Sequence, residues 1–406
     1  MTTTTPHDSS SVAPPSTAKV NPVEWAKKNL FSDWLNSLLT IVVSVILVLV
    51  TVNILSWAFT VAQWEVIPNN LGLFMSGLYR PELYWRIWCM LALVVGLGGF
   101  TWGVLGRDQP TLFGRNVLIG FAVVCAAFVI IPLTRPNSPT LLGLAVLTAA
   151  AAWGGRQLSR KFNAVGQWLP VVWFVSYFIV LWLLGGGLGL QPVRTDRWGG
   201  LVLTLLMAVT GISLCFPIGV TLALGRRSDL PVVKWLSIAY IELIRGVPLI
   251  SIIFMGQVMI PMFLPEGVRP DRILRAVIAL TLFSSAYLAE NVRAGLQSVP
   301  RGQSEAAVSL GLNKPLSLIF IVLPQALKTA IPAIVGQFIS LFQDTTLLAT
   351  LGLLELLGIG QSVLANPNYI GRYAEVYLFA GVVYWFFCYA MSLASRRIEE
   401  QLNKGH

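Results

Sequence analysis

Six ionisable side chains in the second half of the chain lie within or beside long apolar stretches, namely Glu242, Arg245, Glu290, Lys328, Asp344 and Glu355. An ionisable group in hydrocarbon costs at least about 2.5 kcal/mol, and such groups usually face the interior of a helix bundle or a water-filled path. We therefore assign transport to the second half of the chain. The first half is almost free of charge within its apolar runs and resembles an accessory region.

Other kinds of chemistry are excluded by what the sequence lacks. The two histidines, His7 and His406, stand at opposite ends of the chain, which excludes a histidine-based nucleophile relay and a zinc protease site. The four cysteines lie inside apolar runs with no CxxC spacing, as buried small side chains do. There is no GxxxxGK[ST] phosphate loop. We predict no catalytic residue, no metal site and no ATPase in this chain.

Glu242 and Arg245 are three residues apart and share one face of a helix. This spacing allows an ion pair between them, and a direct contact with substrate is the alternative. Gly246 and Pro248 follow at once. Proline removes a backbone donor and kinks a helix, while transporters place substrate where helices break. The stretch thus predicts either an ordinary kink or a substrate site.

Asp344 lies near the end of one apolar segment and at the start of another, over 345–360. Gly352, Gly358 and Gly360 punctuate this second stretch, which is short for a full crossing and favours a re-entrant or broken piece. We expect Asp344 to cap it, with Thr345 assisting. The alternative is contact with a substrate ammonium group.

Two further charges near the cytoplasmic side have simpler interpretations. Glu290 stands three residues before Arg293, which predicts a structural or gating pair. Lys328 is close enough to the cytoplasm for its ammonium group to reach the interface. The candidates for the substrate path are accordingly Glu242, Arg245, Glu290, Asp344 and Thr345.

The elements that must position these groups are membrane helices. The chain of 406 residues is 55% hydrophobic and 11% charged, whereas soluble domains carry about 25% charged residues. Its uncharged runs mostly reach the ~20 residues of a membrane crossing and lack the alternation of a β-barrel. We predict an all-α polytopic bundle of about ten transmembrane helices, over 36–59, 86–106, 116–134, 138–154, 165–186, 199–225, 233–264, 273–293, 316–344 and 375–396.

The net charge of +10 fits a membrane protein whose basic loops stay in the cytoplasm. No arginine-rich or aromatic-interleaved patch predicts nucleic-acid binding. With both termini inside, the inner loops carry more Lys and Arg than the outer loops. We expect a cytoplasmic tail with a short interfacial helix over 1–35, disordered in its first 20 residues. Accessory helices follow over 36–190 and a transport domain over 191–406.

A short helix between two helix breakers is predicted in the loop over 294–315. Pro300 and Gly302 precede it, and Gly311 and Pro315 follow it. Glu305, Ala306 and Ala307 would form a compact docking face, and Gly311 allows a sharp turn at the helix end. The predicted orientation places this loop in the cytoplasm, within reach of a partner protein.

The same loop carries a resemblance to a known family. Glu305-Ala306-Ala307, then Gly311, then Ile321, Leu323 and Pro324 match every fixed position of the EAA---G---------I-LP signature of bacterial ABC import permeases. Residues 242–249, 286–290, 302–307 and 344–347 resemble the polar amino-acid branch of that family. Residues 29–32, 185–190 and 222–228 are similar to its general L-amino-acid subgroup, which also has an extended N-terminus.

This resemblance implies a type I ABC importer permease core in a bacterial inner membrane. It implies that an ATPase dimer couples to the chain through Glu305, Ala306, Ala307, Gly311 and Pro324. The ATPase dimer binds ATP and Mg²⁺, and this chain itself binds no cofactor. It also implies a second, similar permease, membrane lipids around both, a periplasmic substrate-binding protein, and alternating access as the mechanism. Two alternatives are an ion-coupled secondary transporter and a non-transporting assembly subunit.

Overall fold

The computed structural model describes residues 21–403 except 110 and 132, so the tail predicted over 1–20 lies outside the described residues. The chain divides into two units at Gln63 and Trp64, which are described separately. The first unit contains α1 (Pro22–Leu30) and α2 (Trp34–Ser56), which a π turn extends to Val61. Asn21 and Asp33 begin these helices by accepting hydrogen bonds from backbone N–H groups. A short helix, α1, therefore does form within the segment predicted over 1–35.

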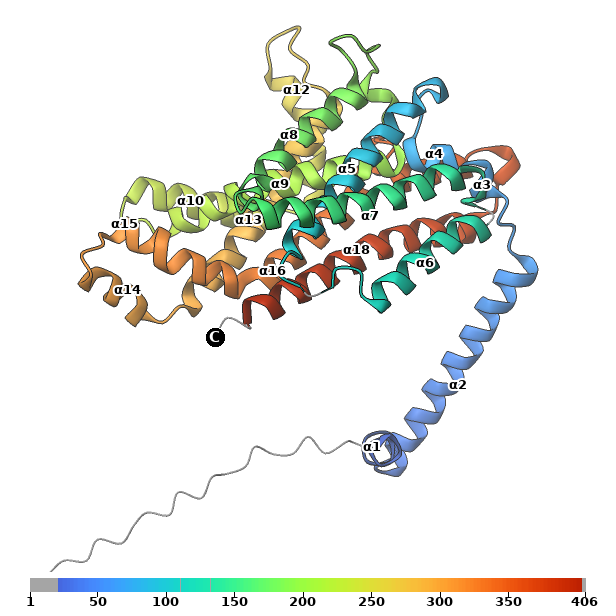
Figure 1. Cartoon of the computed structure of the whole chain (residues 1–406), viewed down its shortest axis with the longest axis horizontal. Helices are drawn as coiled ribbons and strands as arrows, with labels where there is room; N and C mark the ends of the chain where they lie inside the picture. Colours follow the sequence, from blue (N-terminus) through green and yellow to red (C-terminus); the bar gives the residue numbers. More distant parts are fainter. Residues whose placement is uncertain (1–20, 110, 132, 404–406) are drawn as a thin grey trace, which may run out of the picture. The chain divides into compact units, whose positions relative to one another are not determined.

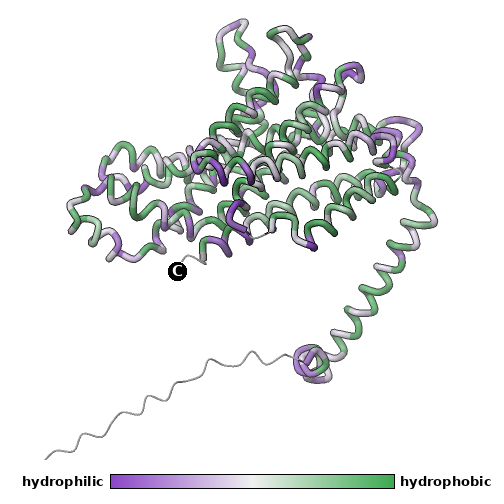
Figure 2. Tube along the Cα trace, in the orientation of Figure 1, coloured by the Kyte–Doolittle hydropathy of each residue, from purple (hydrophilic) through white to green (hydrophobic). Residues whose placement is uncertain are grey.

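The second unit, from Trp64 onward, is a bundle of helices (Figure 1). Its long helices are α5 (Tyr84–Leu105), α6 (Arg115–Ile130), α7 (Ser138–Lys161), α8 (Val165–Gly185), α9 (Gly200–Arg226), α10 (Pro231–Arg245), α13 (Arg272–Ser298), α16 (Leu323–Asp344) and α18 (Tyr373–Asn403). Its short helices are α3 (Val66–Asn69), α4 (Leu71–Ser76), α11 (Leu249–Phe254), α12 (Ile260–Phe263), α14 (Arg301–Ser309), α15 (Lys314–Ser317) and α17 (Leu356–Leu364). Hydrophobic residues follow the lengths of the helices, and hydrophilic residues gather at their connections (Figure 2).

In the described part of the chain, eight helices are long and apolar enough to cross a membrane. The bent pair Pro231–Arg245 and Leu249–Phe263 gives a ninth candidate, and the shorter apolar helix α6 accounts for the remaining predicted segment. The predicted all-α membrane bundle is thus confirmed, with the number of crossings close to the expected ten.

Two predicted helices differ in form from the expectation. The helix predicted over 233–264 is broken, and its halves are bent by 105°. The helix predicted over 116–134 ends at Ile130, because Ile131 precedes a proline and adopts extended backbone with ψ 122°. The 16 residues of α6 are fewer than the ~20 that a perpendicular crossing needs.

The core of the second unit lies around α13, which packs against both α9 and α16. Buried side chains from these three helices, such as Cys215, Leu288 and Ala326, form one apolar cluster with parts of α10 and α18. A second cluster joins α17 to α4 and α18 through Phe74, Ile359 and Val376. This packing places the end of α9, the middle of α10 and the C-terminal half of α13 side by side.

The pair formed by α5 and α7 depends on close backbone approach. A Cβ atom added to Gly103 of α5 would overlap the backbone carbonyl oxygen of Ala152 of α7, whereas one added to Gly98 would meet nothing within 4 Å. We expect Gly103→Ala to lower the free energy of unfolding by about 1–3 kcal/mol, because overpacking forces the helices apart. Gly98→Ala should not lower it. Thermal midpoints of the two purified variants measure the difference, and equal midpoints would contradict the close approach.

Candidate functional site

The segment between α13 and α16 contains the short helix α14, and its two ends are fixed by backbone chemistry. Pro300 precedes α14 with extended backbone, φ −59° and ψ 139°. At the other end, Gly311 has φ +85°, a conformation that glycine adopts without strain. Gly311 N donates to Val308 O at 2.9 Å and Leu312 N to Ala307 O at 3.1 Å. These two bonds form a Schellman motif. The sharp turn predicted at Gly311 is therefore present.

The side chains of α14 divide into a packed and an exposed set. Ala307 is 3% exposed and packs inward, while Glu305 and Ala306 are exposed. The large apolar side chains of Val308 and Leu310 are 55% and 84% exposed. Within the described residues, the Glu305 carboxylate forms no hydrogen bond or ion pair. The helix therefore presents an exposed carboxylate beside exposed apolar side chains, and exposed apolar side chains are typical of surfaces that contact another protein.

α14 is held to the start of α16, and the neighbouring α15 contacts the loop before α10. Gln325 Nε2 donates to Gln303 Oε1 at 3.2 Å, which joins α16 to α14. Lys314 Nζ lies 3.1 Å from the carboxylate of Asp229, but both side chains are more than 80% exposed. Such exposed pairs contribute little to stability. The packing of Ala307 and the Gln303 bond thus position α14.

Pro324 lies at the N-terminal end of α16, directly after a π turn over Leu318–Val322. Proline has no N–H to donate to the preceding turn, and a wider turn accommodates that loss. The same arrangement occurs at Pro261, which follows the π turn Met255–Met259. Pro324 therefore fixes the geometry with which α16 leaves the preceding turn.

A network of five charges joins α9, α10 and α13. The Glu290 carboxylate lies 2.8 Å from Arg226 Nη1, 2.8 Å from Arg293 Nη2 and 3.7 Å from Arg245 Nη1. Arg226 also contacts Glu242 at 3.0 Å. The Glu290 side chain is 15% exposed, the least exposed of the group. Glu290 is therefore the centre of the network.

This network changes the interpretation of Glu242 and Arg245. In the described part of the chain, the two residues form no ion pair with each other, although their spacing on one helix permits it. Glu242 instead contacts Arg226, and Arg245 contacts Glu290. The guanidinium of Arg245 also lies 5.4 Å from the centre of the Tyr287 ring, a cation–π arrangement. The pairing of Glu290 with Arg293 is present as expected.

Directly after Arg245 the chain turns sharply. α10 ends at Arg245, α11 begins at Leu249, and the two directions differ by 105°. Pro248 stands immediately before α11 with φ −58° and ψ 139°. This is a full change of direction rather than the ordinary kink that proline causes inside a continuous helix. The end of α10 and the start of α11 therefore face different directions.

The prediction that Asp344 caps the stretch after it is wrong. Asp344 is the last residue of α16, and its carboxylate accepts no capping hydrogen bond from the following 3-10 turn, Thr345–Leu351. Thr345 is fully buried and its hydroxyl donates back to Phe342 O at 2.7 Å. Because α16 continues directly into the turn, no free helix start exists at residue 345 for a carboxylate to cap.

The residue that does cap the stretch after Asp344 is Glu355, for which the sequence pattern predicts no capping role. Its side chain is fully buried. Glu355 Oε1 accepts from Gly358 N at 2.7 Å, and Oε2 accepts from Leu357 N at 2.9 Å and from Tyr384 Oη at 2.8 Å. The carboxylate thus starts α17 and ties it to α18. Capping residues are usually Ser, Thr, Asp or Asn, so a glutamate gave no capping signal.

The predicted residues do not converge on one site. Pro324 and Asp344 lie near opposite ends of α16, roughly 30 Å apart along a helix of 22 residues. Glu305 and Gly311 lie with Pro324 at one end, while Thr345 lies with Asp344 at the other. In the residues that the structure describes, no group of three His, Cys, Asp or Glu side chains is placed to hold a metal ion.

Comparisons with known proteins identify the family of the chain. The family model described as the inner membrane component of binding-protein-dependent transport systems matches residues 215–404. The inner membrane amino-acid ABC transporter permease protein YhdY of Escherichia coli is 37% identical over 94% of this chain and 93% of its own length. The glutamate/glutamine/aspartate/asparagine transport system permease protein BztC of Rhodobacter capsulatus is 34% identical over 97% of this chain and 96% of its own length.

Shorter relatives match about half of the chain. The probable glutamine ABC transporter permease protein GlnP of Bacillus subtilis is 38% identical over 50% of this chain and 91% of its own length. A crystal structure of an amino acid ABC transporter with histidines is 27% identical, covers 58% of this chain and 98% of that chain, and gives a TM-score of 0.45. On the strength of the two near-full-length relatives, the chain belongs to the family of inner membrane permease components of binding-protein-dependent ABC transport systems.

Proposed function

We propose that this chain is the subunit through which L-amino acids cross the bacterial inner membrane, driven by ATP hydrolysis in a partner chain. The observation that carries the proposal is α14, a short helix between two membrane helices with an unpaired carboxylate and exposed apolar side chains. The substrate class is supported by the names of the relatives, which are amino-acid permeases. Amino acids are zwitterions, which suits a path lined by charges of both signs.

The proposed partners follow from the surfaces of the chain and from its family. An ATPase dimer, which holds ATP and Mg²⁺, docks on α14 through Glu305, Ala306, Val308 and Leu310. A second permease subunit lies beside this one, and a substrate-binding protein delivers the amino acid on the opposite side. Both termini and α14 are then cytoplasmic, as the distribution of Lys and Arg favours. No cofactor is required in this chain, and nucleic acid is not a partner.

The proposed mechanism is alternating access. When the ATPases close on ATP, they displace α14, whose motion is passed to α13 and α16 because α14 lies between these two helices. On α13 it reaches the Glu290 network, where three guanidinium groups from three helices surround one carboxylate. Rearrangement of such a network allows α10 to move relative to α13, which opens or closes the path.

The substrate path is proposed to pass the break after Arg245 and the end of α16. Helix breaks leave backbone groups and helix ends facing a cavity, where transporters hold charged substrates. Asp344 is half-buried and forms no ion pair within the described residues, so its carboxylate is available to the ammonium group of an amino acid. The accessory helices over 36–190 are proposed to stabilise the pair of permeases rather than to contact substrate.

Two other functions remain as alternatives with different signatures. An ion-coupled transporter would use Asp344, Glu290 or Glu242 to carry protons and would have no need of an exposed α14. An assembly subunit would tolerate neutralisation of Arg245, Glu290 and Asp344 without loss of uptake, because its partner alone would hold the substrate.

Uptake of labelled amino acids into vesicles distinguishes these functions. The vesicles contain this chain, its neighbouring permease and the ATPase, with ATP on the side of α14 and the binding protein on the other. We expect uptake to require both ATP and the binding protein, and to be unchanged by a proton ionophore. Uptake that persists without ATP and stops with the ionophore would contradict the proposal.

A further inference from the structure

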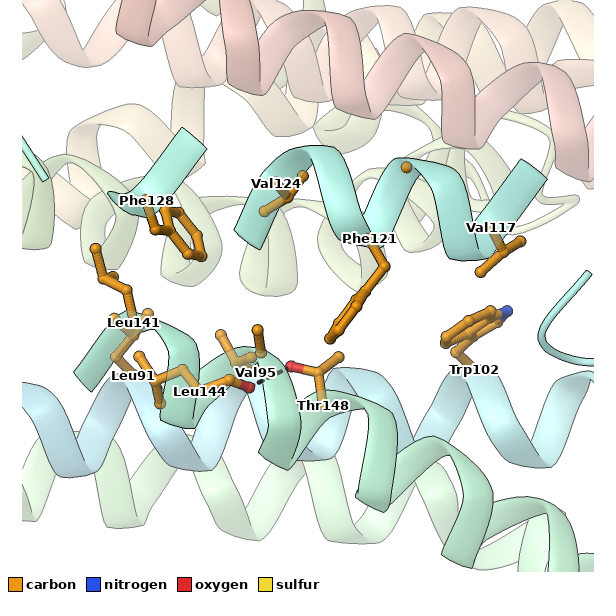
Figure 3. Close-up of a pocket in the computed structure, with 12 residues that line it drawn as sticks. Leu91, Val95, Trp102, Val117, Phe121, Val124, Phe128, Leu141, Leu144 and Thr148 are labelled. Atoms are coloured by element: carbon orange, nitrogen blue, oxygen red, sulfur yellow. Dashed lines mark hydrogen bonds between the residues drawn. The ribbon is translucent and has the colours of Figure 1, made fainter. Parts of the chain in front are cut away.

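An apolar groove of about 490 Å³ lies between α6 and the pair formed by α5 and α7. Figure 3 shows Val117, Phe121, Val124 and Phe128 of α6 facing Trp102, Val95 and Leu141 across it. The α6 residues recur every three or four positions and so form one stripe along the helix. No residue of α6 is buried. The groove separates this stripe from the apolar side chains opposite, so the described residues cover the stripe only in part.

The groove is too small for another membrane helix. A helix with its side chains is about 10 Å across and rises 5.4 Å per turn, so each turn fills roughly 400 Å³. The groove would hold about one turn of a helix, whereas a crossing helix has more than five turns. A slender, flexible hydrocarbon chain fits such a space, because the lining is almost wholly apolar. Its one hydroxyl group, on Thr148, is already bonded to Leu144 O at 2.8 Å.

Positive charge gathers at the end of the groove marked by Trp102 and Val117. The connection between α5 and α6 contains Arg107, and α6 begins at Arg115, two residues before Val117. The last turns of α7 are bonded to this connection, since Arg156 donates to Gln109 O and Arg160 Nε to Arg107 O at 3.2 Å. Lys161 ends α7. Five basic residues from three segments, Arg107, Arg115, Arg156, Arg160 and Lys161, thus lie in or beside the helix ends at this end of the groove.

Little negative charge balances this cluster. Asp108 is the only acidic residue between positions 87 and 163, and it is already paired with Arg107 at 3.3 Å. Arg115 is exposed and forms no hydrogen bond or ion pair with the rest of the described chain. It also lies at the N-terminus of α6, where the helix dipole favours an anion. Basic clusters between membrane helices are suited to anionic lipid headgroups.

From these two observations we infer a binding site for one anionic phospholipid. An acyl chain fills the groove between α6 and the α5–α7 pair, and the phosphate rests against Arg115 and its basic neighbours. The lipid supplies the apolar partner that α6 lacks and so fixes this short helix to the accessory region. With α14 in the cytoplasm, the site faces the inner leaflet of the membrane. This inference does not depend on the transported substrate.

The chain offers a matched pair of variants that tests the apolar half of the site. Gly120 lines the groove, and a Cβ atom added there meets nothing within 4 Å; the same holds for Gly143 of α7, which is exposed and does not line the groove. Gly120→Phe should fill the groove without distorting the helices, while Gly143→Phe should leave the groove open. Both variants are purified as full complexes and accepted only if they elute as the unaltered complex does.

Native mass spectrometry of these complexes counts bound phosphatidylglycerol. We expect the unaltered complex and Gly143→Phe to retain one more phosphatidylglycerol than Gly120→Phe. We also expect Arg115→Gln to weaken retention of phosphatidylglycerol at least fivefold, with no change for phosphatidylcholine. Equal phosphatidylglycerol counts in all variants would overturn the site. So would a Gly120→Phe variant that keeps its lipid but loses the neighbouring permease, because the groove would then receive a protein segment.

Discussion

Replacing Glu355 by alanine is expected to lower the free energy of unfolding by about 2–4 kcal/mol. The carboxylate accepts hydrogen bonds from two backbone N–H groups and from the Tyr384 hydroxyl, all within a buried junction. A buried donor left without an acceptor costs about 1–3 kcal/mol, and loss of a helix cap costs about 1 kcal/mol. The same junction is fixed from α9, where Leu356 N donates to Thr204 Oγ1 at 3.0 Å and Gly200 N to Leu354 O at 2.8 Å.

The size of the effect should follow the number of bonds retained. Glu355→Gln keeps one acceptor oxygen but presents an amide N–H₂ toward the remaining donors, so its loss of stability should lie between those of the alanine variant and the unaltered protein. Glu400→Ala is the control, because that side chain is exposed and forms no bond with the described residues. Thermal midpoints of the purified complexes give the order. A Glu355→Ala variant as stable as Glu400→Ala would contradict the role of Glu355 as a structural cap.

Neutralising Glu290 is also expected to lower the free energy of unfolding, by less than Glu355→Ala does. Glu290→Gln would leave three guanidinium groups on α9, α10 and α13 without their shared carboxylate. Removing one partner of a fully buried ion pair costs about 3–5 kcal/mol. The arginine side chains here are 25–36% exposed, and water screens part of their repulsion. We therefore expect a loss of about 1–3 kcal/mol.

Glu242→Gln is the matched control for this prediction. Glu242 has the same chemistry but a single ionic contact, with Arg226, and its side chain is 55% exposed. Its neutralisation should cost less than about 1 kcal/mol. A double-mutant cycle between Glu290→Gln and Arg293→Gln then measures the pair at 2.8 Å directly. Equal losses for Glu290→Gln and Glu242→Gln, or a coupling energy near zero, would remove Glu290 from the centre of the network.

The membrane helices and α14 were predictable because their signals are local. An uncharged run of about 20 residues has few alternatives to a membrane helix. Pro300 and Gly311 delimit α14 by their own backbone restrictions, and the observed φ of +85° at Gly311 is the conformation that a glycine at a helix end predicts. Each of these conclusions depends on residues within the feature that it explains or directly beside it.

The features that escaped prediction depend on contacts between distant segments. Arg226 is 16 residues before Glu242 and 64 before Glu290, so no spacing rule within one helix could pair them. The partner of Glu355 on α18, Tyr384, is 29 residues away. The 105° break also exceeds what Pro248 alone dictates. Its size is set by where α11 packs, with Leu249 and Ile253 buried against α13 residues such as Ala276 and Leu280.

Coupling through α14 is the central claim, and one comparison tests it most directly. ATP-driven uptake of labelled amino acids is measured in vesicles for the unaltered complex, for Glu305→Ala and for Glu400→Ala, with the amount of assembled ATPase determined in each. Both side chains are exposed glutamates, so the variants differ in position rather than in chemistry. We predict that uptake falls at least tenfold for Glu305→Ala and is unchanged for Glu400→Ala. Full uptake by Glu305→Ala would contradict coupling through this helix.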